Sequence, residues 1–394
     1  MASATNGVNG HKPSQPQSLI QTLDNIGPDS FANDGERIRA VLAAYALISR
    51  LETPWEFVAR TCMGQPALGA ALKVAKDLKL YDKWHELGDG EMTCEQLSEL
   101  VSCDPALLSA NHVLDETSIG VFKPTELSVS FTVPVFGEWI NHLYDATTPC
   151  FFKMPEFLAQ NCYKNPVDPN NGVFQAAKGW KGDMFDYYKS HPVEGASFDH
   201  VMGGVMANQA GWPEIFPANT LLETADAESP LVVDVGGNIG HDIERFRQAY
   251  PQTASRLYLE DLPEVVKRSK CPDDVNKIGY DFFTPQPIKG ARVYYMHGVL
   301  HDWSEEPARK ILEMQKEAMK PGYSTLLIHD HIAPESLAHP HTTAYDLTMM
   351  VMVAGVERRE AHWRALLKSA GYKPVRIWRS PLAVQGVIEA ELDQ

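Results

Sequence analysis

The segment 231–240 (LVVDVGGNIG) constrains the fold more than any other part of the chain. Its apolar half is typical of a strand buried on both faces, and its glycines form a loop that opens a helix. Four more apolar strands are expected at 256–260, 277–280, 291–296 and 324–328, with helical segments between them. This alternation predicts a parallel α/β sheet that is covered by helices on both faces.

Composition and charge exclude several classes of protein. With 44% apolar and 22% charged residues over 394 positions, the chain has the composition of a globular protein and not of a disordered one. The 35 Lys and Arg against 51 Asp and Glu give a formal net charge of −16, which disfavours nucleic acid and anionic membrane surfaces as partners. No apolar run approaches the roughly 18 residues of a transmembrane helix.

The cysteines and the N-terminus favour the cytoplasm. The six cysteines contain no C-x-x-C pair, and no Cys/His spacing is typical of a zinc site, so no metal is expected. Six cysteines are also too few for a disulfide framework in a chain of this length. The first residues, MASATNGVNG, lack the apolar core of a secretory signal, which leaves a reducing cytoplasm as the simplest compartment.

Changes in composition divide the chain into four parts. Residues 1–17 are small and polar and are expected to form a disordered tail. Residues 18–130 carry helical periodicity and are expected to form a helical, winged-helix-like domain used for packing or dimerisation. Residues 131–216 are a helical linker rich in aromatic and methionine side chains, typical of a core or of an apolar pocket wall. Residues 217–394 contain the expected α/β sheet.

A small helix-turn-helix is expected in the second half of the domain 18–130. Thr93 with Gln96 three positions later is a capping-box signal, and Asp104 followed by proline opens a second helix. Residues 120–124 (GVFKP) are expected to form a wing strand. Binding of DNA is disfavoured, because the stretch 93–116 contains no Lys or Arg for phosphate contacts.

The glycine-rich loop and two later strand ends predict a nucleoside site. A dinucleotide fingerprint needs glycine at position 235, where the chain has Val235. The form D-x-G-G-x-x-G instead suits S-adenosylmethionine (SAM), which has no pyrophosphate and needs room for methionine. Asp261 ends the next strand and can bind both ribose hydroxyls. Asp281 and Phe282 end the third strand and can bind and stack on adenine.

His301 follows the fourth strand and is the candidate for catalysis. It lies at the carboxyl end of a parallel strand, where α/β sheets place their chemistry, and Asp302 and a tryptophan follow it. A phenol with a pKa of about 10 needs a base to become a good nucleophile at neutral pH, and an imidazole can take its proton. Asp330 and Glu357 are the candidates that orient this imidazole. His329 and His331 beside Asp330 do not form a metal site, since neighbouring strand residues face opposite ways.

The acceptor pocket is expected to draw on the linker 131–216. Its aromatic and methionine residues form either core or the wall of a pocket for a flat substrate, and both readings stay open. Met202 and Met206 share a helix face at a spacing of four. Phe151 and Trp212 are further candidates, and His142 could polarise a substrate carbonyl.

Six segments carry a resemblance to a known family. They resemble the SAM-dependent O-methyltransferases of the plant caffeate/flavonoid type, in their fungal branch, over roughly residues 60 to 390. The segments are 234–240, 261–263, 281–282, 301–303, 330–334 and 355–358. The resemblance implies a class I methyltransferase domain, Rossmann-like, with an antiparallel last strand at about 383–390. It also implies a helical, winged-helix-like N-terminal domain that forms an intertwined homodimer.

The resemblance also assigns roles to residues. It implies that His301 is the general base, that Asp330 and Glu357 orient it, and that Met349 and Val353 line the acceptor pocket. The chain departs from the family at Asn238, which replaces a glycine, and at His297, where a Lys or Arg near the adenine is usual. The candidates are, for catalysis, His301, Asp302, Asp330 and Glu357; for SAM, Asp234, Gly236, Gly237, Gly240, Asp261, Leu262, Asp281, Phe282 and His297; and for the acceptor, His142, Phe151, Met202, Met206, Trp212, Met349 and Val353.

Three functions remain open from the sequence. The first is O-methylation of a phenolic or enolic secondary metabolite with His301 as general base. The second is a dehydration or pericyclic ring closure in which SAM acts as a fixed positive charge, as in some fungal relatives of this fold. Those enzymes often replace the general-base histidine, and its presence here favours methyl transfer. The third is a SAM-binding scaffold without catalysis.

Overall fold

The structure of the protein is a computed structural model. It describes residues 15–102, 113–207, 210–336, 340–379 and 385–393. The chain forms two compact units, Met1–Phe57 and Val58–Gln394. No helix in the described ranges is both long and apolar enough to cross a bilayer.

The first unit consists of helices without a core of their own. Its elements are α1 (Gln15–Asp24), η1 (Pro28–Ser30), α2 (Asp34–Leu51) and the start of α3 (Pro54–Ala59). Asn33 caps α2 by accepting a hydrogen bond from the Glu36 backbone N–H at 3.1 Å, which fixes where this helix begins. None of the residues of α2 is buried. The start of α1 at Gln15 makes the last three residues of the expected tail helical, and the rest of that tail lies outside the described residues.

The second unit begins with a small helical subdomain around a three-stranded sheet. The strand order is β1-β3-β2, and β3 pairs antiparallel with both neighbours. The capping box is confirmed, because the Gln96 N–H donates to Thr93 Oγ1 and the Thr93 N–H to Gln96 Oε1. The helix expected from Asp104 lies outside the described residues. The elements are η2 (Arg60–Gly64), α4 (Gln65–Asp77), α5 (Leu80–Glu86), β1 (Met92–Thr93), α6 (Cys94–Val101), β2 (Leu114–Ser118), β3 (Val121–Pro124) and α7 (Glu126–Ser130).

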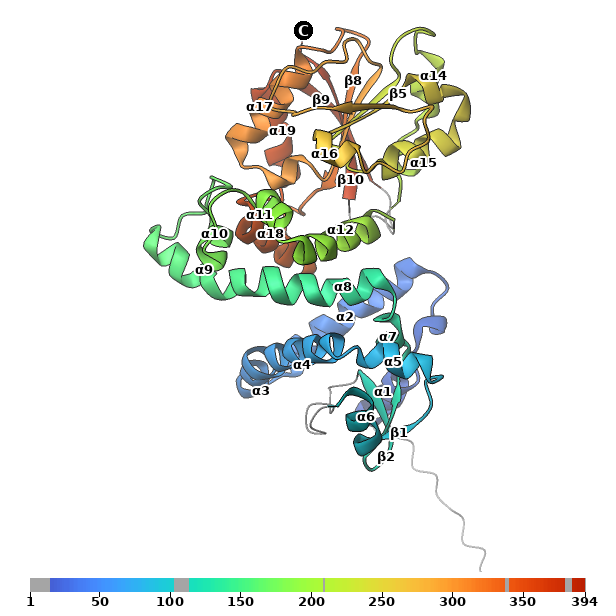
Figure 1. Ribbon diagram of the computed structural model, residues 1–394, viewed down its shortest axis with the longest axis vertical. Helices are drawn as coiled ribbons and strands as arrows, with labels where there is room; N and C mark the ends of the chain where they lie inside the picture. Colours follow the sequence, from blue (N-terminus) through green and yellow to red (C-terminus); the bar gives the residue numbers. More distant parts are fainter. Residues whose placement is uncertain (1–14, 103–112, 208–209, 337–339, 380–384, 394) are drawn as a thin grey trace, which may run out of the picture. The chain divides into compact units, whose positions relative to one another are not determined.

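A layer of helices follows. The segments α8, η4 and α9 run on without a break, and Figure 1 shows them as one long rod. The middle segment, η4, is a turn of π-helix, a feature frequent at functional sites. The elements are α8 (Pro134–His142), η4 (Leu143–Thr147), α9 (Thr148–Gln160), α10 (Val173–Lys178), α11 (Met184–Ser190) and α12 (Pro192–Ala207).

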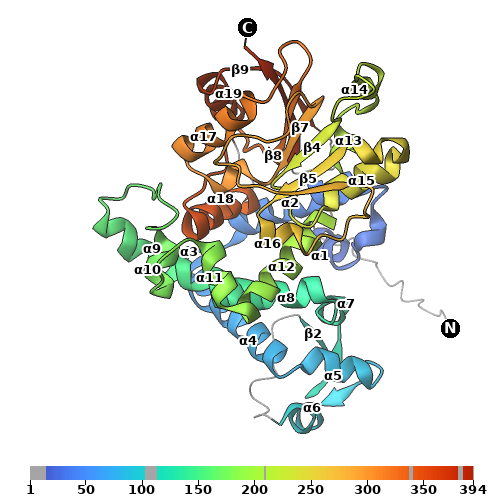
Figure 2. The same cartoon turned by 45° about the horizontal axis from the view of Figure 1, so that its top comes forward.

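The expected α/β sheet is confirmed. Its seven strands run in the order β6-β5-β4-β7-β8-β10-β9, the first five parallel and β10 antiparallel to both of its neighbours. Figure 2 shows β4, β5, β7 and β8 side by side. The strands are β4 (Val232–Val235), β5 (Leu257–Asp261), β6 (Asn276–Gly279), β7 (Val293–His297), β8 (Thr325–His331), β9 (Tyr372–Arg379) and β10 (Gln385–Leu392).

Helices cover both faces of this sheet. Alternate residues of each strand belong to two separate apolar cores: Tyr294 and Met296 of β7 lie in one, Val293 and Tyr295 in the other. Helices α17 and α19 complete the first core, and α13, α14 and α15 complete the second, on the opposite side of the sheet (Figure 2). The remaining elements of this part are α13 (Trp212–Ile215), α14 (Asn219–Glu223), α15 (His241–Ala249), η5 (Pro251–Arg256), α16 (Pro263–Val266), η6 (Leu300–Asp302), α17 (Glu305–Lys316), α18 (Pro340–Val353) and α19 (Glu360–Ser369).

Candidate active site

The glycine loop joins β4 to α15 and has the backbone shape of a ligand cradle. Gly236 and Gly240 have φ angles of +71° and +97°, which glycine adopts without strain. A Cβ at Gly236 would lie only 2.9 Å from Val299 Cγ2, so a larger residue at this position would clash with Val299. Asn238, in place of a glycine, has a φ of +54°, which asparagine tolerates better than most residues.

Asp234 is the last residue but one of β4, beneath this loop, and carries an unpaired carboxylate. It is 1% exposed, and neither carboxylate oxygen has a hydrogen-bond partner among the described residues. Burial, followed by the nearby charge of Asp242, holds the pKa of Asp234 well above its usual value. Because an unpaired buried carboxylate costs free energy, this position fits a ligand that brings a hydrogen-bond donor or a cation, as the ammonium of SAM does.

The next two strand ends supply the groups expected for a nucleoside. The Asp261 carboxylate accepts hydrogen bonds from the backbone N–H groups of Asn238, at 2.8 Å, and Leu262, at 2.7 Å, which joins it to the glycine loop. Phe282 lies close to Gly236, 3.6 Å from where a Cβ would be, and contacts Trp303 edge to face. The aspartate before it, Asp281, accepts from the Phe283 N–H at 2.9 Å. The loop, the acid and the aromatic ring thus share one edge of the sheet, and together they fit SAM.

His301 lies on η6, directly after β7, among three carboxylates. Its Nδ1 is 2.9 Å from Glu357 Oε1 and 3.5 Å from Asp330 Oδ1, and its Nε2 is 3.6 Å from Asp302 Oδ1. The side chain of His301 is 16% exposed, whereas those of Asp330 and Glu357 are fully buried. Asp330 Oδ2 and Glu357 Oε2 have no hydrogen-bond partner in the described structure. The sequence named these four residues separately, and the structure brings them together.

The charges in this cluster favour a protonated imidazole. Burial alone would lower the pKa of His301, but Asp330, Asp302 and Glu357 outweigh it and hold that pKa well above its usual value. Burial raises the pKa of Asp302 to about 6. Burial would also raise the pKa of Glu357, but the facing His301 offsets this and lowers it. With Nδ1 directed at Glu357, Nε2 is the nitrogen that can exchange a proton with a substrate.

Two residues that the sequence did not single out hold the loop of His301 in place. Arg358 is fully buried, and its guanidinium donates to the backbone carbonyls of Leu300 and Trp303, both at 2.7 Å. The Asp346 carboxylate accepts from the Glu357 backbone N–H at 2.9 Å. The signal for Arg358 was its position next to Glu357 in an already recognised motif. Asp346 gave no signal, because its contact depends on how α18 packs.

The structure gives His297, which was expected among the residues that bind the cofactor, two partners within the protein. His297 is 7% exposed, and both of its ring nitrogens are already engaged, Nδ1 with Asp242 Oδ2 at 2.6 Å and Nε2 with Gln385 Oε1 at 2.8 Å. Trp212, expected in the acceptor pocket, is 1% exposed and stacks on Phe246 in the core behind the sheet. It therefore offers no surface to a substrate.

Of the acceptor candidates, Phe151 lies on α9, Met202 and Met206 lie on α12, and Met349 and Val353 lie on α18. Met349 accepts a hydrogen bond from the Gly355 N–H through its backbone carbonyl, and the Val356 N–H donates to the His301 carbonyl at 2.9 Å, so the end of α18 adjoins the loop of His301. Met349 and Phe151 are partly buried and pack against the core cluster that contains Val353. Met202 is partly exposed on α12. The side chain of Met206 lies outside the described residues.

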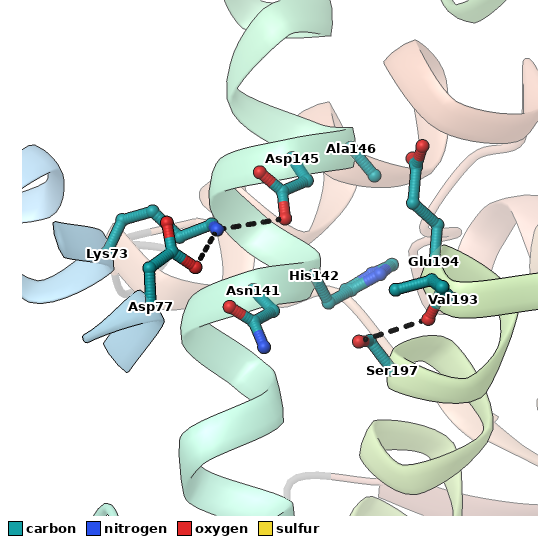
Figure 3. A pocket seen from close by; sticks show the side chains of 9 residues that line it. All are labelled: Lys73, Asp77, Asn141, His142, Asp145, Ala146, Val193, Glu194 and Ser197. Atoms are coloured by element: carbon teal, nitrogen blue, oxygen red, sulfur yellow. Dashed lines mark hydrogen bonds and ion pairs between the residues drawn. The ribbon is translucent and has the colours of Figure 1, made fainter. Parts of the chain in front are cut away.

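His142 lines a separate polar cavity of about 130 Å³. In Figure 3 it reaches from α8 toward Val193 and Glu194 of α12. His142 is 8% exposed, and its Nδ1 has no partner among the described residues. Burial lowers the pKa of His142 to about 4, so the ring is neutral at physiological pH.

Comparison with known proteins decides the family. Residues 164–373 match the model of the O-methyltransferase domain. The chain belongs to the O-methyltransferase family. It is 92% identical to O-methyltransferase mfmE of Annulohypoxylon moriforme, over 100% of both chains. It is 31% identical to O-methyltransferase ATR12 of Stachybotrys chlorohalonatus, over 95% of this chain and 98% of that one.

Solved structures confirm the methyltransferase fold. LepI in complex with SAM is 25% identical with a TM-score of 0.84, covering 96% of this chain and 98% of that one. OxaC in complex with S-adenosylhomocysteine (SAH) and oxaline is 23% identical with a TM-score of 0.81, covering 95% and 96%. This O-methyltransferase is therefore an enzyme that uses SAM and acts on a small molecule, which sets the scaffold hypothesis aside.

Proposed function

We propose that this enzyme methylates a phenolic or enolic hydroxyl of a secondary metabolite and that His301 is its general base. The observation that carries the proposal is the single partly exposed imidazole whose Nδ1 lies 2.9 Å from the buried Glu357 carboxylate. A carboxylate on Nδ1 fixes the tautomer and orientation of the ring and stabilises it when it gains a proton.

The proton follows a short path in this proposal. The acceptor hydroxyl gives its proton to Nε2 of His301, and Glu357 with Asp330 stabilises the imidazolium that results. SAM, when bound at the loop of Gly236, supplies an electrophilic methyl group. Because the three acids raise the pKa of His301, the free base is populated only toward alkaline pH. The rate of reaction is therefore expected to rise with pH through that pKa.

The experiment that tests the proposal uses trideuteromethyl-SAM and a set of phenols and enols. The purified enzyme is incubated with each acceptor, and the products are compared by mass spectrometry with a control lacking enzyme. A product that carries the deuterated methyl group on oxygen supports methyl transfer. The same product formed at the same rate by His301→Ala would rule out the general-base role.

The cavity of His142 is proposed to receive the end of the acceptor that is remote from the methylated oxygen. Ala146 lines the cavity and belongs to the same apolar core as Val353, which adjoins the loop of His301. A substrate carbonyl or hydroxyl would satisfy the unpaired Nδ1 of His142. His142→Phe is expected to raise the acceptor KM about tenfold while leaving SAH affinity unchanged. An unchanged acceptor KM would show that the acceptor does not bind in this cavity.

A second candidate function is a pericyclic or dehydration reaction. The raised pKa of His301 makes it a cation near neutral pH, and a fixed cation can stabilise a developing oxyanion without accepting a proton. LepI and a structure described as a pericyclic reaction enzyme, both 25% identical, share the fold. In the experiment with labelled SAM, a product that changes in retention without gaining the label would favour this candidate.

The proposed partner of the first unit is a second copy of the chain. Helix α2 exposes apolar side chains at helical spacing, and none of them is buried within the chain: Ile38, Val41, Leu42, Tyr45 and Ile48. A face of this kind favours burial against another protein surface. Light scattering is expected to give twice the mass of one chain, and Leu42→Glu to lower it. Ile119→Glu, at a fully exposed position in the β2–β3 turn, is the matched control.

The proposed compartment is the reducing cytoplasm. The described cysteines Cys62, Cys94, Cys150, Cys162 and Cys271 are all free thiols, as expected there. A fluorescent fusion that co-localises with secretory compartments would contradict this placement.

A further inference from the structure

His297 is a second buried histidine, at the end of the strand that precedes the loop of His301. The proposed reaction does not use it. His297, the last residue of β7, is 2.6 Å from Asp242 of α15 and 2.8 Å from Gln385 of β10. Its ring stacks on that of His329 of β8, with centroids 4.0 Å apart and planes 19° apart. Tyr295 Oη, in turn, is 2.9 Å from His329 Nδ1. Four structural elements thus meet at one polar cluster behind the sheet.

Of the two stacked rings, that of His297 is the one whose protonated form is favoured. Burial lowers the pKa of His329 to about 3, and the charge of His297 adds to this effect. Burial would lower the pKa of His297 too, but Asp242 outweighs it and raises that pKa. The pair His297–Asp242 is therefore an ion pair, with both side chains no more than 9% exposed.

Asp242 connects this ion pair to the cofactor loop. It lies in the first turn of α15, two residues after Gly240, the glycine that closes the loop. Burial is the main reason why the pKa of the unpaired Asp234 carboxyl beneath the loop is raised, and the negative charge of Asp242 raises that pKa further. Without the proton on His297, two buried carboxylates would repel each other at the base of the loop. Asp242 thus links the ion pair to the base of the glycine loop.

We propose that the buried His297–Asp242 ion pair is a positioning device for the cofactor, which ties the first turn of α15 to β7 and β10 and so holds the glycine loop in its binding shape. The inference rests on the proposed placement of SAM at the loop of Gly236, and it is independent of the role of His301. His297 is a positioning residue and not a catalytic one, because it acts only through Asp242.

The ion pair makes cofactor binding depend on pH. Besides each other, the groups that act on His297 and Asp242 are Asp234 of β4, His329 and Asp330 of β8, Gln385 of β10 and Arg245 of α15. Since the pKa of His297 is raised, its proton is present at neutral pH and is lost as the pH rises through that pKa. SAH affinity is therefore expected to fall at alkaline pH, where the deprotonated form of His301 favours the proposed reaction.

The test measures SAH affinity by calorimetry at pH 7 and 9, together with the melting temperature of each variant. His297→Gln is expected to raise the Kd for SAH about tenfold at pH 7 and to abolish the pH dependence seen in the wild type. The kcat at saturating SAM is expected to stay within about threefold. His85→Gln is the matched control, because His85 Nδ1 lies 2.7 Å from Asp89 Oδ2 in an exposed pair remote in sequence from the loop.

Two further measurements keep the inference open to refutation. If His297→Gln does not fold, the near-isosteric Asp242→Asn is used, and the wild-type pH titration of SAH binding needs no variant. A Kd within twofold of wild type in a folded variant, or a wild-type Kd constant from pH 7 to 9, would overturn the proposal. His301→Ala tests the proposed function separately. If it loses catalysis while SAH binding keeps the pH dependence of the wild type, the two proposals rest on different residues.

Discussion

Two histidines four residues apart, His297 at the end of β7 and His301 just after it on η6, have different surroundings. Burial alone would lower the pKa of both histidines, but the carboxylates that face them outweigh it and raise both pKa values. They differ in what surrounds the second nitrogen. His297 Nε2 is bonded to Gln385, whereas His301 Nε2 lies 3.6 Å from Asp302 in a side chain that is 16% exposed.

The difference follows from the alternation of the sheet. Residues 295, 297 and 329 lie on the face that packs against α15, and Asp330 of the same strand contacts His301 instead. On the first face every ring nitrogen of His297 is satisfied, which is typical of a structural group. Near His301, carboxylate oxygens of Asp330 and Glu357 remain unpaired, which is typical of a site that waits for a ligand or a proton.

The largest expected effect separates the two histidines by their chemistry. His301→Asn is expected to lower kcat about 1,000-fold, since it removes the proposed general base, while SAH affinity stays within twofold. His297→Gln is expected to change kcat at saturating SAM by no more than about threefold. Steady-state kinetics with a deuterium-labelled methyl donor measure both. Equal losses of kcat in the two variants would erase the distinction drawn here.

The next effect concerns stability. Asp242→Asn removes one partner of a buried ion pair and is expected to lower the free energy of unfolding by about 3 kcal/mol near pH 6. Because the pKa of Asp242 is lowered in the fold, its share of the stability is present above the unfolded pKa of about 3.9 and is lost as the pH falls through the folded value. Because the pKa of His297 is raised, its share is complete below about 6.5 and is lost as the pH rises through the folded value.

Urea unfolding at several pH values checks this window. The difference between wild type and Asp242→Asn should be largest between about pH 4 and 6.5 and should shrink on either side. Asp89→Asn, in the exposed pair with His85, should change the free energy of unfolding by less than about 1 kcal/mol. A difference that is constant from pH 4 to 9 would mean that the two groups are not an ion pair in solution.

A smaller effect tests the acid that faces His301. Glu357→Gln removes a charge that raises the pKa of His301, so the base is free at lower pH. The acid limb of kcat/KM is expected to move to lower pH, and kcat at the optimum is expected to fall about tenfold because the imidazolium loses its stabilising carboxylate. A pH–rate profile of both enzymes measures this. An acid limb at the same pH in both would assign it to another group.

Much of the α/β domain could be predicted because its signals are local. Four of the five parallel strands, β4, β5, β7 and β8, are short and largely apolar runs, and the capping box at Thr93 involves residues only three apart. The strand β9 was not predicted, since Lys373, Arg376 and Arg379 interrupt its apolar residues at the exposed edge of the sheet. Its place next to β10 comes from pairing, which no local pattern encodes.

The site could be predicted where residue type and strand position agree, and not where a partner is distant. His301 was found because it follows a parallel strand beside acids. His297 was assigned to the cofactor because its true partners, Asp242 and Gln385, lie 55 and 88 residues away. Trp212 was assigned to the pocket because an aromatic pattern does not show which face of the domain it covers, and it stacks on Phe246 in the core.

The smallest expected effect is the response to metal removal. His301, Asp330 and Glu357 present ligand atoms within 4.8 Å of one another, a grouping that could hold a cation. However, Glu357 Oε1 and His301 Nδ1 are 2.9 Å apart, the distance of a hydrogen bond between them, and a shared cation would have to break it. EDTA is therefore expected to leave kcat within about 20% of the untreated value. A loss of activity that Zn²⁺ or Mn²⁺ restores would contradict this prediction. His301 would then be a metal ligand and not the general base.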